Sequence, residues 1–460
     1  MDGGDTSVAY KDLRVPGGRT STAVTLILTS RGVTSRRDPS RPGAEFARAW
    51  VQSVGSTVIA MNDHHPLSNV SLGDLRKRTS EKWRHYPADV LPLWVAEMDV
   101  SLAEPIERAL LDAARTGDLG YPIAERYVEA LAAFATRHWK WSDIQPARSR
   151  AVANVMSGVA AAIAALTEPG DSVVVNCPVY PPFYSYTANS GRVVDEAPLG
   201  PDGRLDFDTL EAAFERAQSR SRRPAYLLCN PHNPTGTLHR RDELARLLDL
   251  ADHYGLRVIA DEIHAPLVLR GAFTPLLSVD GAERAVAVLS ASKAFNLAGA
   301  PAAVVVAGEG ATDVIDHLGH LVVPGPSHLG VIAQSAALTD ADDWLDVLLG
   351  DLRARQALLV GLLADNLPEA VYLPGDATYL AWLDVGGLDL PASGASTRGE
   401  MAATSGPAAF FVDHARVALS DGAAFGTGGS GHVRLNFATT ESILCDALER
   451  LGRSVHVARG

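Results

Sequence analysis

Two ionisable side chains follow apolar, strand-like runs and could act together on an aldehyde. Lys293 lies in the small-residue segment SASKAFNLAG, and Asp261 ends the run VIAD in VIADEIHAPL. A lysine amine that is desolvated, or that lies near another cation, can form a Schiff base with a carbonyl. A buried carboxylate is costly unless it meets a cation, and a protonated pyridine nitrogen would be one. The alternatives are a solvated loop lysine, and an aspartate in a structural ion pair or helix N-cap.

Two further segments could bind the polar groups of such a ligand. Asn233 lies in CNPHNPTG, where two prolines and a glycine favour a rigid turn that could direct the amide at a ring hydroxyl. Gly158 lies in MSGVAAAIAA, where we expect a helix to start, and helix N-termini bind phosphate through free N–H groups and the dipole. An ordinary turn or helix start explains either segment alone. The four segments together indicate one ligand site.

Alternating helices and strands must position these segments. Near-continuous apolar strands separated by helices favour a mostly parallel sheet with helices on both faces. Ligands bind such sheets at the carboxyl ends of the strands, where the four segments lie. The pattern predicts strands at 172–175, 226–229, 257–260, 286–290 and 302–307, and helices at 104–115, 126–138, 158–166, 207–216, 241–254, 343–366 and 441–453.

Composition excludes several classes of partner. The 460 residues carry a formal net charge of -13, which disfavours nucleic acid and anionic lipid. Cys177, Cys229 and Cys445 match no metal-binding spacing and cannot all pair, so we expect no metal site and a cytoplasmic location. No apolar run approaches the length of a membrane span, so we expect no membrane partner.

The combined pattern resembles the fold-type I enzymes of the class I/II aminotransferase superfamily, which use pyridoxal 5′-phosphate (PLP), and within them the MalY/PatB-type cystathionine β-lyases. NPHNPTG with a downstream S-x-x-K is typical of the superfamily. The lyase branch is indicated by KWRHYPADVLPLWVAEMD, PVYPPF, DEIH and ATYLAWLD. The resemblance extends from about Asp74 to residue 453.

The resemblance implies an α/β fold whose large domain has three α/β/α layers and a mostly parallel sheet, with a smaller C-terminal α/β domain. We expect the large PLP-binding domain at 106–340 and the small domain at 341–460, with an N-terminal arm and part of the small domain at 61–105. Residues 1–60 are rich in Gly, Ser, Thr, Arg and Pro, and we expect a disordered extension there. A targeting peptide is the alternative.

The resemblance also implies roles around the cofactor ring. Lys293 would hold PLP covalently and, once freed by substrate, act as the general base for the Cα proton. Asp261 would keep the pyridine nitrogen protonated. Asn233 and His264 would lie at the ring 3′-oxygen, and Tyr180 would stack on the ring face.

Phosphate and carboxylate ligands follow from the same resemblance. The phosphate would meet Gly158, the backbone of Val159 and Ala160, the hydroxyl of Ser290, and Tyr121 from the partner subunit of a homodimer. The substrate α-carboxylate would meet the fork of Arg434, assisted by the backbone near Ala96 and by Asn233. For Arg434, the alternative from the residues alone is a surface salt bridge.

The implied reaction is α,β-elimination from an amino acid substrate, L-cystathionine or another cysteine S-conjugate, to pyruvate, ammonia and a thiol. The alternatives are transamination and, on the same fold, a regulatory binding protein. Many aminotransferases have an arginine where this chain has Pro301, and the lyase branch shares its absence. The sequence departs from the lyase pattern at Glu97, Ala294 and the Ala265–Pro266 pair, which puts the identity of the substrate in doubt more than cofactor use.

Overall fold

The computed structural model describes residues 65–320, 325–392 and 406–459. The chain divides into two units, residues 1–65 and 66–460, and the fold described below belongs to the second. The expected extension at 1–60 lies outside the described residues. Within the described ranges, no helix is both long enough and apolar enough to span a membrane.

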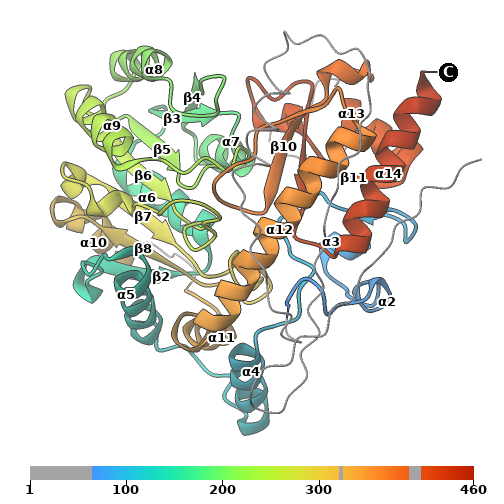
Figure 1. Ribbon diagram of the computed structural model, residues 1–460. Coiled ribbons are helices and arrows are strands. Elements are labelled where there is room, and N and C mark those ends of the chain that lie inside the picture. The colour runs from blue at the N-terminus through green and yellow to red at the C-terminus, as the bar shows by residue number, and fades with distance from the viewer. Residues whose placement is uncertain (1–64, 321–324, 393–405, 460) are drawn as a thin grey trace, which may run out of the picture. The chain divides into compact units, whose positions relative to one another are not determined.

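A seven-stranded sheet forms the centre of the larger part of this unit (Figure 1). Strand β8 runs antiparallel to both of its neighbours, and the other neighbouring pairs are parallel, so the expected mostly parallel sheet is confirmed. In spatial order the strands are β2 (Ser149–Val152), β8 (Ala303–Ala307), β7 (Val286–Leu289), β6 (Arg257–Asp261), β5 (Ala225–Cys229), β3 (Ser172–Cys177) and β4 (Val193–Pro198).

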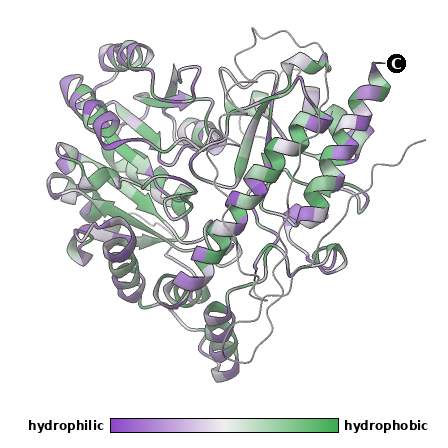
Figure 2. Cartoon of the chain, viewed as in Figure 1, coloured by the Kyte–Doolittle hydropathy of each residue, from purple (hydrophilic) through white to green (hydrophobic). Residues whose placement is uncertain are grey.

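Helices cover both faces of this sheet, which gives the expected three layers. Alternate residues of each strand point to opposite faces and enter separate hydrophobic clusters. One face packs against α6 (Val155–Leu166), α7 (Pro182–Asn189) and α10 (Thr312–His320). The other packs against α5 (Glu125–Trp139), α8 (Phe207–Arg220), α9 (Arg241–His253) and α11 (His328–Asp340), with α4 (Glu104–Thr116) against α11. Figure 2 shows the apolar strands between helices whose outer sides are hydrophilic.

A smaller, four-stranded sheet is built from the C-terminal part of the chain. Its order is β12 (Ser420–Asp421), β13 (His432–Asn436), β10 (Leu380–Asp384) and β9 (Val371–Tyr372), all antiparallel. The long helix α12 (Asp342–Asn366) packs against α14 (Glu441–Ala458), and α13 (Gly406–Phe410) lies beside β12. The smaller C-terminal α/β part that the sequence predicts is therefore present.

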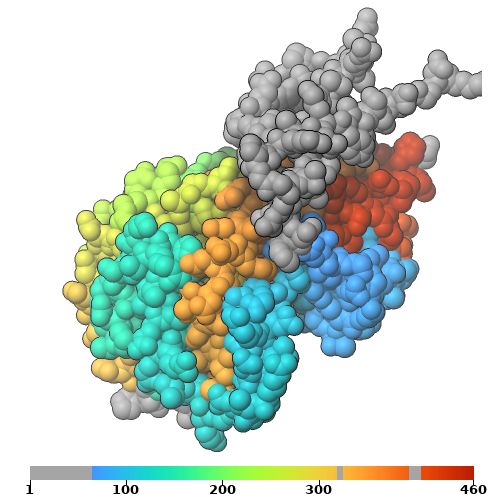
Figure 3. Space-filling view, turned by 60° about the horizontal axis from the view of Figure 1, so that its bottom comes forward, coloured from blue at the N-terminus to red at the C-terminus, as the bar shows by residue number. Residues whose placement is uncertain are grey.

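The start of the described chain joins this C-terminal part. After the short helices α2 (Leu72–Leu75) and α3 (Glu81–Arg84), strand β1 (Leu91–Pro92) pairs in parallel with β11 (Val417–Ala418). Figure 3 shows these early residues, in blue, beside the red C-terminal residues. The segment after β1 then runs toward the edge of the large sheet, where Ala96 lies near Lys293.

Candidate active site

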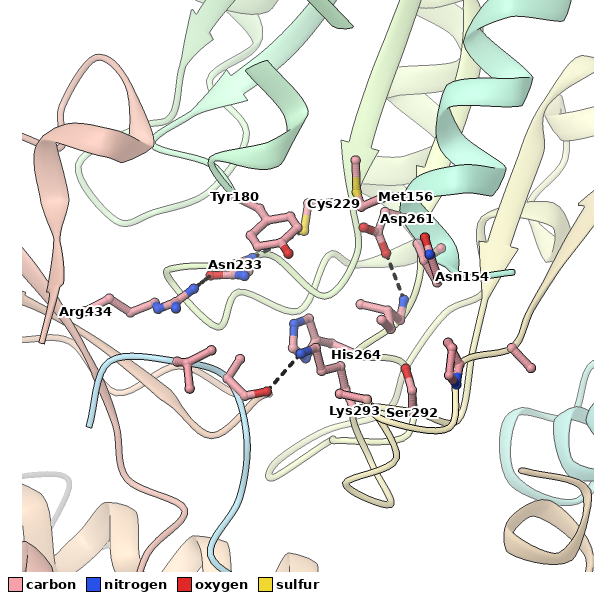
Figure 4. A pocket seen from close by; sticks show the side chains of 17 residues that line it. Asn154, Met156, Tyr180, Cys229, Asn233, Asp261, His264, Ser292, Lys293 and Arg434 are labelled. Atoms are coloured by element: carbon pink, nitrogen blue, oxygen red, sulfur yellow. Dashed lines mark hydrogen bonds between the residues drawn. The ribbon is translucent and has the colours of Figure 1, made fainter. Parts of the chain in front are cut away.

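A cavity of about 190 Å³ lies at the carboxyl edge of the large sheet. Parallel strands bring their carboxyl ends to one edge, so the polar segments that follow them converge there. Figure 4 shows the converging side chains. Arg434 comes from β13 of the small sheet, and the others come from the ends of β3, β5, β6 and β7. The converging side chains are Tyr180, Asn233, Asp261, His264, Lys293 and Arg434.

Lys293 is not a solvated loop lysine. Its Nζ donates a hydrogen bond to the backbone oxygen of Ala96, 2.8 Å away. Burial, followed by the positive charge of Arg434, lowers the pKa of Lys293 from 10.5 to about 8. A lysine in this state has a substantial fraction of neutral, nucleophilic amine near neutral pH.

Asp261 is a buried carboxylate at the end of β6. Its Oδ1 accepts a hydrogen bond from the backbone N–H of Ile263, at 3.0 Å. Burial raises the pKa of Asp261 to about 7. It forms no ion pair with any residue in the described ranges, so the structural ion pair considered above is wrong. A cation inside the cavity would stabilise its charged form.

His264 and Tyr180 contribute uncharged rings to the cavity. Burial lowers the pKa of His264 from 6.5 to about 3, so its imidazole is neutral at physiological pH. Its Nδ1 is buried and has no hydrogen-bond partner among the described residues. Burial raises the pKa of Tyr180 to about 12, so its hydroxyl stays protonated. The unsatisfied imidazole nitrogen requires a polar partner from a ligand or solvent.

Arg434 is fully buried in β13, so the alternative of a surface salt bridge is wrong. Its Nη1 donates to Oδ1 of Asn233 at 3.1 Å, and its Nη2 donates to the backbone oxygen of Trp94 at 3.0 Å and to Ser420 Oγ at 3.2 Å. Neutral acceptors thus orient the guanidinium while its charge faces the cavity. That arrangement suits the binding of a carboxylate.

The structure places the start of α6 three residues before Gly158, which corrects the expected start. Asn154 is the N-cap, and the first helical residue is Val155. Gly158 N–H already bonds to the Asn154 oxygen, at 3.1 Å, so Val159 and Ala160 lie in the body of the helix. The Asn154 side chain accepts from the Ser157 N–H at 2.9 Å, which leaves the first-turn N–H groups of Val155 and Met156, and both of these residues line the cavity.

Packing explains the glycine at 158. A Cβ there would lie 2.8 Å from Val288 Cγ1 and 3.0 Å from Val305 Cγ2, so glycine lets α6 approach β7 and β8 closely. Gly158, Val159 and Ala160 do not line the cavity.

Two further predicted residues also lie away from the cavity. Ser290 is buried behind it, where its hydroxyl donates to the Ala302 oxygen at 2.7 Å. Ser292, two residues later, lines the cavity instead. Tyr121 is 99% exposed in this single chain, on a segment that contributes nothing to the cavity. Its predicted role in a partner subunit stays a prediction.

Sequence reasoning missed Val155, Met156 and Ser292. An asparagine directly before an apolar, Ala-rich run is a strong N-cap signal, and Asn154 would have given the correct helix start. No comparable signal separates Ser292 from Ser290, because the choice depends on how the chain turns after β7.

The residues present fit the cofactor that the sequence predicts. The cavity offers an amine at Lys293, and a carboxylate at Asp261 that has no ion-pair partner in the part of the chain that the structure describes. It also offers the unsatisfied imidazole of His264 and the two free N–H groups at the start of α6. These match the aldehyde, ring nitrogen, ring oxygen and phosphate of PLP in chemical type.

Comparison with known proteins defines the class. The family model described as "Aminotransferase class I and II" matches residues 94–451, and the chain belongs to that family. Within it, a Mycobacterium leprae protein named "Putative cystathionine beta-lyase" is 49% identical over 85% of this chain and 98% of its own length. The "Cystathionine beta-lyase" of Corynebacterium glutamicum is 33% identical, covering 83% and 98% of the two chains.

Solved structures agree with this assignment. Cystalysin from Treponema denticola, whose crystal structure contains pyridoxal 5′-phosphate, superimposes with a TM-score of 0.75 at 26% identity. The match covers 86% of this chain and 99% of that one. The fold is therefore the fold-type I arrangement that the motifs predict.

Proposed function

We propose that this chain is a PLP-dependent C–S β-lyase that cleaves L-cystathionine or related cysteine S-conjugates to pyruvate, ammonia and a thiol. The observation that carries the proposal is the convergence of the Lys293 amine, the Asp261 carboxylate and the Arg434 guanidinium on one cavity. The relatives named for cystathionine β-lyase activity cover nearly the whole described unit and support the choice of substrate.

Bound PLP supplies the aldehyde that captures an amino acid and the ring that accepts electrons from its Cα. Arg434 binds the substrate carboxylate, and its bond to Asn233 fixes its direction. Lys293, with its pKa lowered to about 8, takes the Cα proton. The Asp261 carboxylate would stabilise a protonated ring nitrogen of the bound cofactor.

The remaining contacts hold the cofactor in place. The N–H groups of Val155 and Met156 and the Ser292 hydroxyl would hold the phosphate at the positive end of the α6 dipole. Tyr180 and Ile263 both line the cavity and would enclose the ring, and neutral His264 would bond to the ring oxygen.

The active assembly is proposed to be a cytoplasmic homodimer. The segment around Tyr121 exposes Leu119 by 61% and Ile123 by 64%, and a second copy would bury these side chains. Tyr121 would then approach the partner's phosphate site. The three cysteines are free thiols, which suits a reducing compartment.

A two-arm assay tests the function. Purified enzyme loaded with PLP is given L-cystathionine, with and without a 2-oxo acid, and both pyruvate and new amino acid are measured. The lyase proposal requires pyruvate without the 2-oxo acid. Product formation only in its presence would establish transamination instead. Lys293→Ala should abolish turnover, whereas a biological phenotype that survives this substitution would support a regulatory binding role.

A further inference from the structure

The backbone of residues 95–98 is held in place on several sides. The Asn436 amide donates to the oxygens of Val95 and Glu97, at 2.8 and 2.7 Å. Lys82 Nζ donates to the Glu97 oxygen at 2.8 Å. We call residues 95–98 the strap. It crosses from the small sheet to the lysine, and its position decides where the oxygen of Ala96 lies.

Two donors share the Ala96 oxygen. Lys293 Nζ lies 2.8 Å from it and Tyr379 Oη lies 3.0 Å from it. Tyr379 belongs to ATYLAWLD and is 1% exposed, so its hydroxyl has no access to bulk solvent. The strap thus supplies the direct hydrogen-bond acceptor for the amine of Lys293.

Asn296 ties the strap to the loop that carries the lysine. Its Oδ1 accepts from the Met98 N–H at 2.8 Å, and its Nδ2 donates to the Met98 oxygen at 3.0 Å. The two bonds form a closed clip between the backbone of Met98 and a residue three positions after Lys293. Asn296 has a φ of 55°, a left-handed conformation that asparagine tolerates better than most side chains.

A buried ion pair holds the residue that directly follows the strap. Lys82 Nζ lies 2.8 Å from Asp99 Oδ2, and both side chains are almost fully buried. Trp83 Nε1 donates to the other oxygen of Asp99 at 3.0 Å. The Asp99 N–H also donates to the Ala438 oxygen, at 2.9 Å, just after β13, so this residue is tied to the small-sheet side while Asn296 attaches Met98 to the lysine loop.

We propose that Asn296 is a positioning residue: its clip on Met98 holds the Ala96 oxygen against Lys293, so that this oxygen receives the ammonium form of the lysine after proton transfer. The inference rests on the proposed function. In that step the Cα–H bond breaks, its electron pair stays on the substrate side, and the proton forms a new N–H bond on Lys293. The Ala96 oxygen then accepts a hydrogen bond from the ammonium and retains the proton near the reacting atoms.

Among the groups around the amine, the Ala96 oxygen is the one that Lys293 Nζ contacts directly by a hydrogen bond in the described ranges. Arg434 disfavours the ammonium by its charge, whereas Glu97 and Asp261 favour it. The remaining neighbours, His264 and Tyr379, are neutral at working pH because burial lowers the pKa of the first and raises that of the second. Hydrogen bonds to charged groups are strong enough to move a pKa by about one to two pH units.

The test substitutes Asn296→Gly, because glycine accepts a positive φ and removes only the clip. The matched control is Lys140→Gly, which makes the same exchange at a φ of 56° at the C-terminus of α5. In the cofactor-free full chain, carbamylation of Lys293 by cyanate is followed against pH by peptide mass spectrometry. In the PLP-loaded enzyme, kcat and KM for L-cystathionine are measured.

The carbamylation midpoint is the pH at which Lys293 reacts with cyanate at half its maximal rate. N296G should lower this midpoint by about one pH unit. It should also reduce kcat about tenfold and leave KM within about twofold. K140G should match the wild type. A second variant, Tyr379→Phe, leaves the Ala96 oxygen to the lysine alone and should raise the midpoint. An unchanged midpoint in N296G, or a Y379F midpoint at or below the wild-type value, overturns the proposal. Because carbamylation needs no turnover, either result is distinguishable from failure of the lyase activity.

Discussion

Removing the charge of Asp261 should stabilise the cofactor-free protein. An aspartate normally titrates near 3.8, and burial raises the pKa of Asp261 to about 7. The folded state therefore favours the protonated carboxyl, and stability falls as the pH rises from about 4 to about 7. A difference of about 3 pH units, at 1.36 kcal/mol each, corresponds to a cost of at most about 4 kcal/mol above pH 7.

Asp261→Asn is a nearly isosteric change that removes this cost. Urea unfolding of both cofactor-free proteins at about pH 4 and about pH 8 should give similar free energies at the lower pH. At the higher pH the variant should be more stable, by up to about 4 kcal/mol. With PLP added, the wild type should become more stable than D261N. Ligand binding stabilises the folded state, and the protonated ring nitrogen of PLP pairs with a carboxylate but not with an amide.

Glu262→Gln is the matched control. Glu262 is the next residue, is fully buried and has a pKa raised to about 8 by burial. Its Oε1 accepts from Asn230 Nδ2 at 3.1 Å and from the Leu276 N–H at 2.8 Å, and it does not line the cavity. The control should bind PLP as the wild type does. If the free energies of unfolding of D261N and the wild type differ by the same amount at both pH values, Asp261 does not carry a destabilising charge in the cofactor-free protein.

Four further substitutions test the site and its support. Arg434→Lys should raise KM for cystathionine about 10- to 100-fold in steady-state assays, because a lysine cannot replace a two-pronged contact; an unchanged KM would remove Arg434 from the carboxylate site. Ser292→Ala should weaken PLP binding about tenfold in a fluorescence titration, whereas Ser290→Ala should lower only the urea midpoint. If Ser290→Ala weakened PLP binding more than Ser292→Ala, the phosphate contact would belong to Ser290. Gly158→Ala should destabilise the fold by about 1–3 kcal/mol, since its Cβ would lie 2.8 Å from Val288 Cγ1, and unchanged stability would contradict the close packing.

Much of the fold could be predicted because apolar runs and strand spacing are local properties. The strands at β5, β6 and β7 lie within one residue of their expected bounds. The direction of β8 could not be predicted, since a short run of valine and alanine reads the same in either orientation. The sequence does not predict strands β2 and β4, because their partly exposed residues give no continuous apolar signal.

The site was predicted best where a residue ends a strand. Asp261, Asn233 and Lys293 were placed correctly at one cavity because the carboxyl ends of parallel strands meet. The predicted helix start at Gly158 is wrong, because α6 begins at its Asn154 cap, so Val159 and Ala160 lie away from the cavity lining. The burial of Arg434 could be expected only from the family resemblance, since most arginines lie at the surface.

The reversal of β8 has a consequence for redesign of this enzyme. Because β7 and β8 are antiparallel neighbours, the chain that carries Lys293 leaves and re-enters the sheet at the same edge, without a helix to carry it back across the molecule. Lys293 therefore lies on a connection, residues 290–302, that is anchored at both ends in neighbouring strands, so an insertion there would shift the amine. Variation aimed at new substrates is better directed to the facing small sheet, where loops can change length without moving the amine.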